Sequence, residues 1–103
     1  VTDVSAPGLT FGDYDRAARD IIETAGYGQA FSHGIGHGLG RDVHEIPYFP
    51  KTSQERLVEN LIITNEPGIY VENLGGVRIE DDLLITSQGV EVLTKAPREL
   101  IIL

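Results

Sequence analysis

The stretch SHGIGHGLGRDVHE, residues 32–45, contains all three histidines of the chain and four of its 12 glycines. Glycines alternate with other residues here, and at roughly 0.8–1 kcal/mol each they disfavour a helix by about 3–4 kcal/mol. We therefore expect an extended or looped backbone. The histidines could be metal ligands, proton carriers or half-exposed residues of a glycine-rich hairpin, and these alternatives stay open on spacing alone.

The spacing of the histidines limits what they can share. His33 and His37 are four residues apart, which in a strand places them on one face but about 13 Å from each other. Metal–nitrogen bonds are only about 2.0–2.1 Å long, so an extended stretch allows at most one of the two as ligand to a given ion. His44 has the opposite parity and needs a bend to converge, which Gly38 and Gly40 allow.

Two carboxylates further along the chain strengthen the case for a functional site. Glu66 lies in TNEPGIY, at a predicted strand end before Pro67, and Glu80 lies in GGVRIEDD with Arg78 on the same face by period-2 alternation. A carboxylate that projects from a strand beside an arginine is suited to bind a metal or a substrate. The alternatives are a turn residue for Glu66 and a surface ion pair, worth little, for Glu80 and Arg78.

The segment before the histidines predicts one helix over residues 9–28. Thr10 is the expected N-cap, and Gly26 is a plausible C′ residue. The apolar residues recur at the 3–4 spacing of a single buried face, which comprises Phe11, Tyr14, Ala17, Ala18, Ile21, Ile22 and Ala25.

The remainder of the chain is typical of strands. β-Branched or alternating runs occupy residues 56–71, 75–86 and 89–95, ELIIL (99–103) could form a last edge strand, and residues 47–56, with two prolines, predict a loop. We expect one helix followed by four to six mostly meandering strands, which is an α+β unit.

Composition excludes several classes of protein. A length of 103 residues with 41% hydrophobic residues suits one globular domain, and a formal charge of −8 argues against partners such as nucleic acid or anionic membranes. Without cysteine the chain has no disulfide or thiolate metal site. It also has no spanning apolar run and no signal peptide, so we expect a cytoplasmic location.

Three motifs together are more specific than any one of them. HGIGHGLGRDVHEIP, NEPGIY and GGVRIEDDLLIT, in this order and spacing, resemble the C-terminal part of the pita-bread metallopeptidases. These are the aminopeptidase P and prolidase (Xaa-Pro dipeptidase) enzymes, relatives of methionine aminopeptidase and creatinase. The resemblance covers about residues 6–95. It implies one long helix plus a mostly antiparallel curved sheet, and metal-dependent hydrolysis of the peptide bond that precedes proline in an Xaa-Pro peptide substrate.

The resemblance also implies roles for individual residues. In this family two divalent metal ions (Mn, Co, Fe or Zn) share two aspartates, one histidine and two glutamates. The matching positions imply His37, Glu66 and Glu80 as metal ligands, with Glu66 also as the catalytic proton shuttle. They imply His33 and His44 as catalytic residues that bind the substrate and the transition state. Arg78 is implied as a further substrate-binding residue.

One part of the family pattern has no match. The two aspartate ligands of the family lie well before the histidine stretch, whereas only 32 residues precede His33 here and they hold no such pair. We interpret residues 1–103 as the C-terminal part of a catalytic domain, with the N-terminal part absent, and the lack of a starting methionine agrees with this. We expect the chain alone to be inactive and to bind at most one metal ion weakly.

Two other functions stay in view. A methionine aminopeptidase shares the histidine segments, but EPGIY and GGVRIED look more like the Xaa-Pro branch. A non-catalytic pita-bread module that binds proteins usually loses ligands, whereas His37, Glu66 and Glu80 are all present, and the same three residues argue against the metal-free creatinase. The family often dimerises, so a homodimer is an expectation that the residues themselves leave open.

Overall fold

The single α-helix, α1, spans Phe11–Thr24 in a computed structural model that describes all 103 residues. It begins as predicted, because the Thr10 hydroxyl accepts a hydrogen bond from the Asp13 amide at 3.0 Å. The helix ends four residues earlier than the predicted residue 28. Gly26 then adopts φ +89°, which confirms it as the left-handed C′ residue, and a 3₁₀ turn, η1 (Gly28–Ala30), follows.

The buried face of α1 differs in part from the predicted one. Phe11, Tyr14 and Ala18 are buried as expected, but Ile21 is 69% exposed. Asp15 and Arg19 are buried in its place, at 0% and 7% exposure. The prediction of Ile21 as a buried residue was therefore wrong. The pattern of apolar residues cannot show that a carboxylate and a guanidinium neutralise each other inside the protein.

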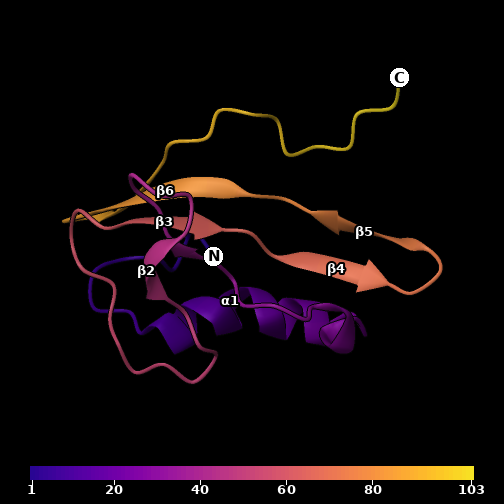
Figure 1. Ribbon diagram of the computed structural model, residues 1–103, viewed down its shortest axis with the longest axis horizontal. Helices are drawn as coiled ribbons and strands as arrows, with labels where there is room; N and C mark the ends of the chain where they lie inside the picture. Colours follow the sequence, from indigo (N-terminus) through magenta and orange to yellow (C-terminus); the bar gives the residue numbers. More distant parts are fainter.

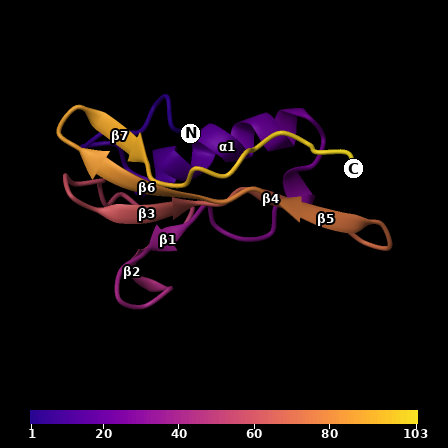
Figure 2. The same ribbon diagram turned by 90° about the horizontal axis from the view of Figure 1, so that it is seen from above.

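Seven antiparallel strands form two sheets (Figures 1 and 2). The larger sheet has the order β2-β1-β3-β6-β7, and the smaller one is the hairpin β4-β5. The strands are β1 (His37–Gly38), β2 (Glu45–Tyr48), β3 (Ile62–Asn65), β4 (Gly68–Val71), β5 (Gly75–Arg78), β6 (Asp81–Thr86) and β7 (Gly89–Val92). The expected α+β class with a mostly antiparallel sheet is confirmed.

β3 and β4 on one side, and β5 and β6 on the other, form one long two-stranded ribbon with a break in the middle. Ile62 pairs with Leu84 at one end and Val71 with Gly75 at the other, and the register is the same on both sides of the break. The interruption falls at Pro67, which has no amide hydrogen to donate. The unchanged register sets Glu66 opposite Glu80 at this break.

The hydrophobic core lies between α1 and the larger sheet. Ile63, Leu83 and Ile85 are each fully buried on the side of the ribbon that faces the helix. Because side chains alternate across a strand, Thr64 and Asp82 point toward the opposite face. The remaining core residues come from the helix and the connections, namely Phe11, Tyr14, Ala18, Phe31, Ile35, Phe49 and Leu57.

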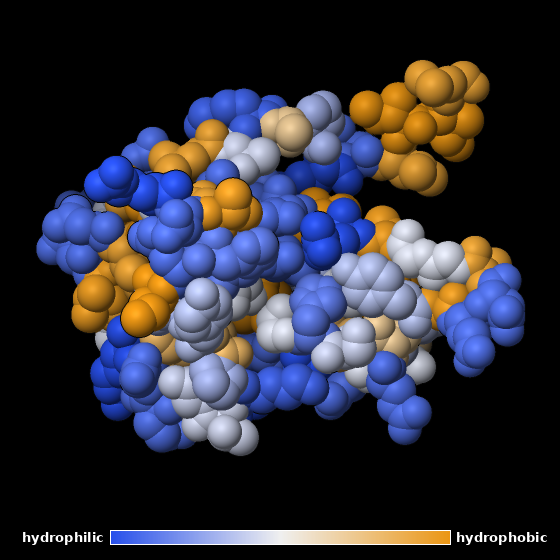
Figure 3. Space-filling model, viewed as in Figure 1, coloured by the Kyte–Doolittle hydropathy of each residue, from blue (hydrophilic) through white to orange (hydrophobic).

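Three predictions about the strands were wrong. The structure has seven strands instead of the expected four to six. Residues 99–103 form no strand, and Leu100 and Ile102 are almost fully exposed. The C-terminal segment runs beside the ribbon without pairing with it (Figure 1), and a hydrophobic group projects from the molecule at this end of the chain (Figure 3). β2 reaches into the segment that was predicted as a loop, since Pro47 is tolerated in an edge strand. No helix of the structure has the length and apolar character needed to cross a membrane.

Candidate metal centre

The three residues proposed as metal ligands converge at the break in the ribbon. Each of His37, Glu66 and Glu80 offers one ligand atom, and these atoms all lie within 4.8 Å of one another. Glu66 directly follows β3, Glu80 directly precedes β6, and His37 lies on β1, which pairs with β3 through Gly38 and Ile63. Side chains 29 and 43 residues apart in sequence are thus brought together by strand pairing alone.

The ring of His37 is oriented in a way that suits a cation. It is 9% exposed, and its Nδ1 lies 2.8 Å from the carbonyl oxygen of Gly38, to which only an N–H can donate. In the neutral ring Nε2 then carries the lone pair, and it lies 2.9 Å from Oε1 of Glu66. A lone pair facing a carboxylate oxygen at this distance needs a proton or a metal ion between them. With two nearby carboxylates this donor set fits a divalent cation.

His44 comes close to His37 through the bend that the glycines allow. The chain turns between β1 and β2, and the two ring centroids lie 4.3 Å apart. His44 is exposed, and its ring is not among the groups that converge with the two glutamates. Its position beside the proposed metal ligands leaves the ring of His44 open to another molecule.

His33 occupies a third place at the site. Its Nδ1 donates to the carbonyl oxygen of Gly34 at 2.8 Å, and its Nε2 lies 3.2 Å from the hydroxyl of Tyr70. Its ring packs at 5.1 Å from that of Phe31. His33 therefore lies outside the ligand group, as the spacing argument required for one member of the His33 and His37 pair.

Arg78 spans the two glutamates. Its Nε lies 3.6 Å from Oε2 of Glu66, and its terminal nitrogen lies 3.6 Å from Oε2 of Glu80. Hydrogen bonding to Tyr70, followed by the charges of Tyr70, Glu66 and Glu80, raises the pKa of Arg78 above its ordinary value. Arg78 thus stays a permanent cation beside the carboxylates, with its side chain 49% exposed.

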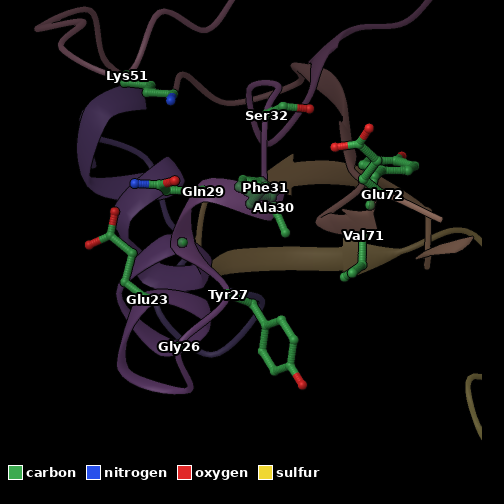
Figure 4. Close-up of a pocket in the computed structure, with 12 residues that line it drawn as sticks. Glu23, Gly26, Tyr27, Gln29, Ala30, Phe31, Ser32, Lys51, Val71 and Glu72 are labelled. Carbon is green, nitrogen blue, oxygen red and sulfur yellow. The ribbon is translucent and has the colours of Figure 1, made fainter. Parts of the chain in front are cut away.

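All three histidines line one cleft of about 470 Å³ together with Glu66 and Arg78. Gly34 and Gly36 of the histidine stretch also line it. A larger hollow of about 1020 Å³ lies beside the end of α1 and β4, where Glu23, Lys51 and Glu72 are placed (Figure 4). No group of three possible metal ligands forms in that hollow.

A buried ion pair holds the histidine segment in place. Arg19 binds Asp15 through Nε at 2.6 Å and through its second terminal nitrogen at 3.0 Å. The same guanidinium donates to the carbonyl oxygens of Phe31 and His33, while Asp15 accepts from the amide of Ile35 at 3.1 Å. α1 is thereby attached to the backbone on both sides of His33.

Sequence reasoning missed several residues of the site. Tyr70 lies four residues after Glu66. In an extended chain residues at this spacing share one face, so the spacing was an available signal. Thr64 lies two residues before Glu66 and contacts both His37 and Glu66. The Asp15 and Arg19 pair has the i, i+4 spacing of a helical ion pair, but nothing in the sequence indicated that it is buried.

Comparisons with known proteins agree with this arrangement. The model of the family described as "Metallopeptidase family M24" matches residues 1–87. The chain is 52% identical over 101 residues to a putative dipeptidase, YkvY, of Bacillus subtilis, and this covers 98% of the chain and 28% of that protein. It is 48% identical over 99 residues to the Xaa-Pro dipeptidase of Pyrococcus furiosus, covering 96% of the chain and 28% of that protein.

A solved structure gives the same result. The prolidase from Pyrococcus horikoshii superposes with a TM-score of 0.92 at 48% identity, over 97% of this chain and 29% of that one. The chain therefore spans less than a third of the length of the relatives that it matches.

Proposed function

The chain belongs to metallopeptidase family M24, and from this premise we propose that the full-length protein hydrolyses the peptide bond that precedes proline in Xaa-Pro peptides. The observation that carries the proposal is the convergence of His37, Glu66 and Glu80 within 4.8 Å, on segments that match Xaa-Pro dipeptidases. The names of the similar proteins support the choice of substrate, since one is called an Xaa-Pro dipeptidase and another a prolidase.

We propose that His37, Glu66 and Glu80 are three of the protein ligands of a pair of divalent metal ions. One imidazole and mostly carboxylate oxygens suit Mn²⁺, Co²⁺ or Fe²⁺ as well as Zn²⁺. When bound, such ions supply Lewis acidity that polarises a carbonyl and lowers the pKa of water. The Nδ1–H bond of His37 to Gly38 fixes the tautomer that such a role requires.

The other residues act on the substrate in this proposal. Glu66 accepts the proton of the attacking water and passes it to the amine that leaves. His44, exposed beside His37, donates to the oxygen on which negative charge develops, and His33 holds the substrate next to it. Arg78, which lies beside Glu66 and Glu80, is a further substrate-binding residue.

The charge balance sets what the 103-residue chain can do by itself. Two divalent ions bring +4, whereas Glu66 and Glu80 bring −2, and no further carboxylate joins the group of possible ligands. We propose that this chain alone binds at most one divalent ion weakly and has no appreciable peptidase activity. A cytoplasmic location and a homodimer stay predictions from the sequence.

The experiment is a substrate comparison on the full-length protein supplied with Mn²⁺. We expect hydrolysis of Ala-Pro, no hydrolysis of Ala-Ala or Met-Ala-Ser, and loss of activity in Glu66→Gln and Glu80→Gln. Preferential release of methionine would instead identify a methionine aminopeptidase. A folded protein that cleaves none of these peptides with Mn²⁺, Co²⁺, Fe²⁺ or Zn²⁺ would favour the non-catalytic binding module.

A further inference from the structure

We infer that the hydroxyl of Thr64 is a positioning group that fixes His37 and Glu66 relative to each other. The inference rests on the proposed function, because it concerns two of the proposed ligands. Thr64 lies on β3, is 1% exposed, was not proposed as a site residue from the sequence, and lies outside the group of possible ligands. Its side chain is nevertheless the one that touches both residues.

The direction of both hydrogen bonds is determined by chemistry. Oγ1 of Thr64 lies 3.0 Å from the backbone nitrogen of His37, which can only donate. It lies 3.0 Å from Oε1 of Glu66, and an ionised carboxylate can only accept. The single hydroxyl proton therefore goes to Glu66, and a lone pair receives the amide of His37.

The hydroxyl is itself held rigidly. The backbone of Thr64 lies in β3, between β1 and β6, and its carbonyl oxygen accepts a hydrogen bond from Tyr14 of α1 at 2.9 Å. Gly36 allows the histidine segment to come this close. A Cβ at Gly36 would lie 2.0 Å from the carbonyl oxygen of Thr64 and 2.7 Å from Oγ1. A β-branched side chain also has few rotamers, so the hydroxyl has a fixed direction.

The bond from Thr64 decides how the carboxylate of Glu66 is turned. Oε1 receives the hydroxyl and faces Nε2 of His37 at 2.9 Å, while Oε2 lies 3.6 Å from Nε of Arg78. The terminal torsion of a glutamate is broad, so without the hydroxyl the carboxylate is free to rotate toward the permanent cation. The Thr64 hydroxyl therefore opposes Arg78 and keeps one oxygen of Glu66 with His37.

The test compares two variants with the parent, all as full-length, metal-free protein, by their affinity for Mn²⁺. The affinity is measured by calorimetric titration and by the electron paramagnetic resonance signal of free Mn²⁺. Thr64→Val keeps the shape and removes the hydroxyl, and we expect it to weaken binding about 10- to 100-fold, as losses of groups that orient metal ligands do. Thr64→Ser restores the hydroxyl with less volume, and we expect it to bind within about threefold of the parent.

The outcomes separate the inference from the proposed function. Equal Mn²⁺ affinity in Thr64→Val and the parent, or equal loss in Thr64→Val and Thr64→Ser, overturns the positioning role. If Thr64→Val does not fold, Thr64→Ala takes its place against Thr64→Ser, and only a loss confined to Thr64→Ala supports the role. Failure of the parent to bind Mn²⁺, or unchanged binding in His37→Ala and Glu66→Gln, overturns the proposed function and the inference with it.

Discussion

The long ribbon has an inner half, formed by β3 and β6, and an outer half, formed by β4 and β5. The two halves share one register, yet Ile63, Leu83 and Ile85 of the inner half are fully buried, whereas all four residues of β5 are exposed. Val77 of the outer half is 58% exposed. Strand pairing is the same, but only the inner half has neighbouring strands in its sheet. The end of α1 lies beside β4 of the outer half (Figure 1).

This difference shows that coverage, rather than pairing, distinguishes the two halves. A two-stranded hairpin in water is marginally stable, and three or more strands or a packed helix are needed for independent stability. Glu66 and Glu80 lie at the boundary between the inner half and the outer half of the ribbon. The proposed ligands are thus anchored on one side only.

The largest effect is expected from the ion pair that attaches α1 to the inner half. Asp15→Ala leaves Arg19 buried without its partner and removes the acceptor of the Ile35 amide. We expect a loss of about 3–5 kcal/mol in the free energy of unfolding, measured with urea. The matched control is Asp13→Ala on the same helix, whose exposed pair with Arg16 contributes little. Equal losses in both variants would contradict the assignment of a buried anchor.

The second prediction compares the two halves directly. Leu83→Ala removes a fully buried side chain from the inner half, and we expect it to cost about 2–5 kcal/mol of unfolding free energy. Val77→Ala, in the half-exposed outer strand, is expected to change that free energy by about 0.5 kcal/mol or less. Urea unfolding of both variants measures the difference. A cost at Val77 close to that at Leu83 would mean that another part of the protein covers the outer half.

The third prediction concerns the boundary. Mn²⁺ at 100 times its dissociation constant should raise the free energy of unfolding of the full-length protein by about 2.7 kcal/mol. If the ion joins Glu66 to Glu80, amide hydrogen exchange in β4 and β5 should also slow, since opening the break then requires release of the ion. Glu80→Gln serves as the control. Unchanged exchange in β4 and β5 of the parent would show that the metal does not couple the halves.

The smallest effect is expected at the start of α1. Thr10→Ala removes the acceptor of the Asp13 amide, and we expect a loss of about 1 kcal/mol, within the range of about 0.5–2 kcal/mol for such caps. Thr10→Ser should keep most of that stability. Thermal unfolding is the measurement, and hydrogen exchange in β5 should stay the same, because the cap lies beneath the inner half alone.

Local rules were enough to predict much of the fold. Thr10 and Gly26 have well-defined roles at helix ends, and the alternation in residues 75–92 is a direct consequence of strands with two faces. ELIIL was misjudged because an apolar run predicts a strand only where another strand is available to pair with it. The buried Asp15 and Arg19 could not be predicted, since their burial depends on backbone carbonyl and amide groups 12 to 20 residues away.

The site was predictable to a different extent. Spacing alone limited His33 and His37 to one ligand, and the structure brings His37, but not His33, to the two glutamates. The roles themselves came from the family resemblance and stay predictions. Thr64 escaped notice because a threonine in a β-strand is ordinary. The inferred role of its hydroxyl depends on a contact with His37, which lies 27 positions away on the neighbouring strand.

The unbroken register of the ribbon has a consequence for how the chain can change in length. The hairpin β4–β5 sets the number of residues between Glu66 and Glu80, but the two glutamates meet because of the pairing in β3–β6. Residues added in pairs, one to each strand of the hairpin, lengthen its tip and leave the same side chains opposite each other at its base. A single residue inserted into one strand reverses every following side chain. The tip is therefore a segment that can vary in steps of two without disturbing the chemistry below it.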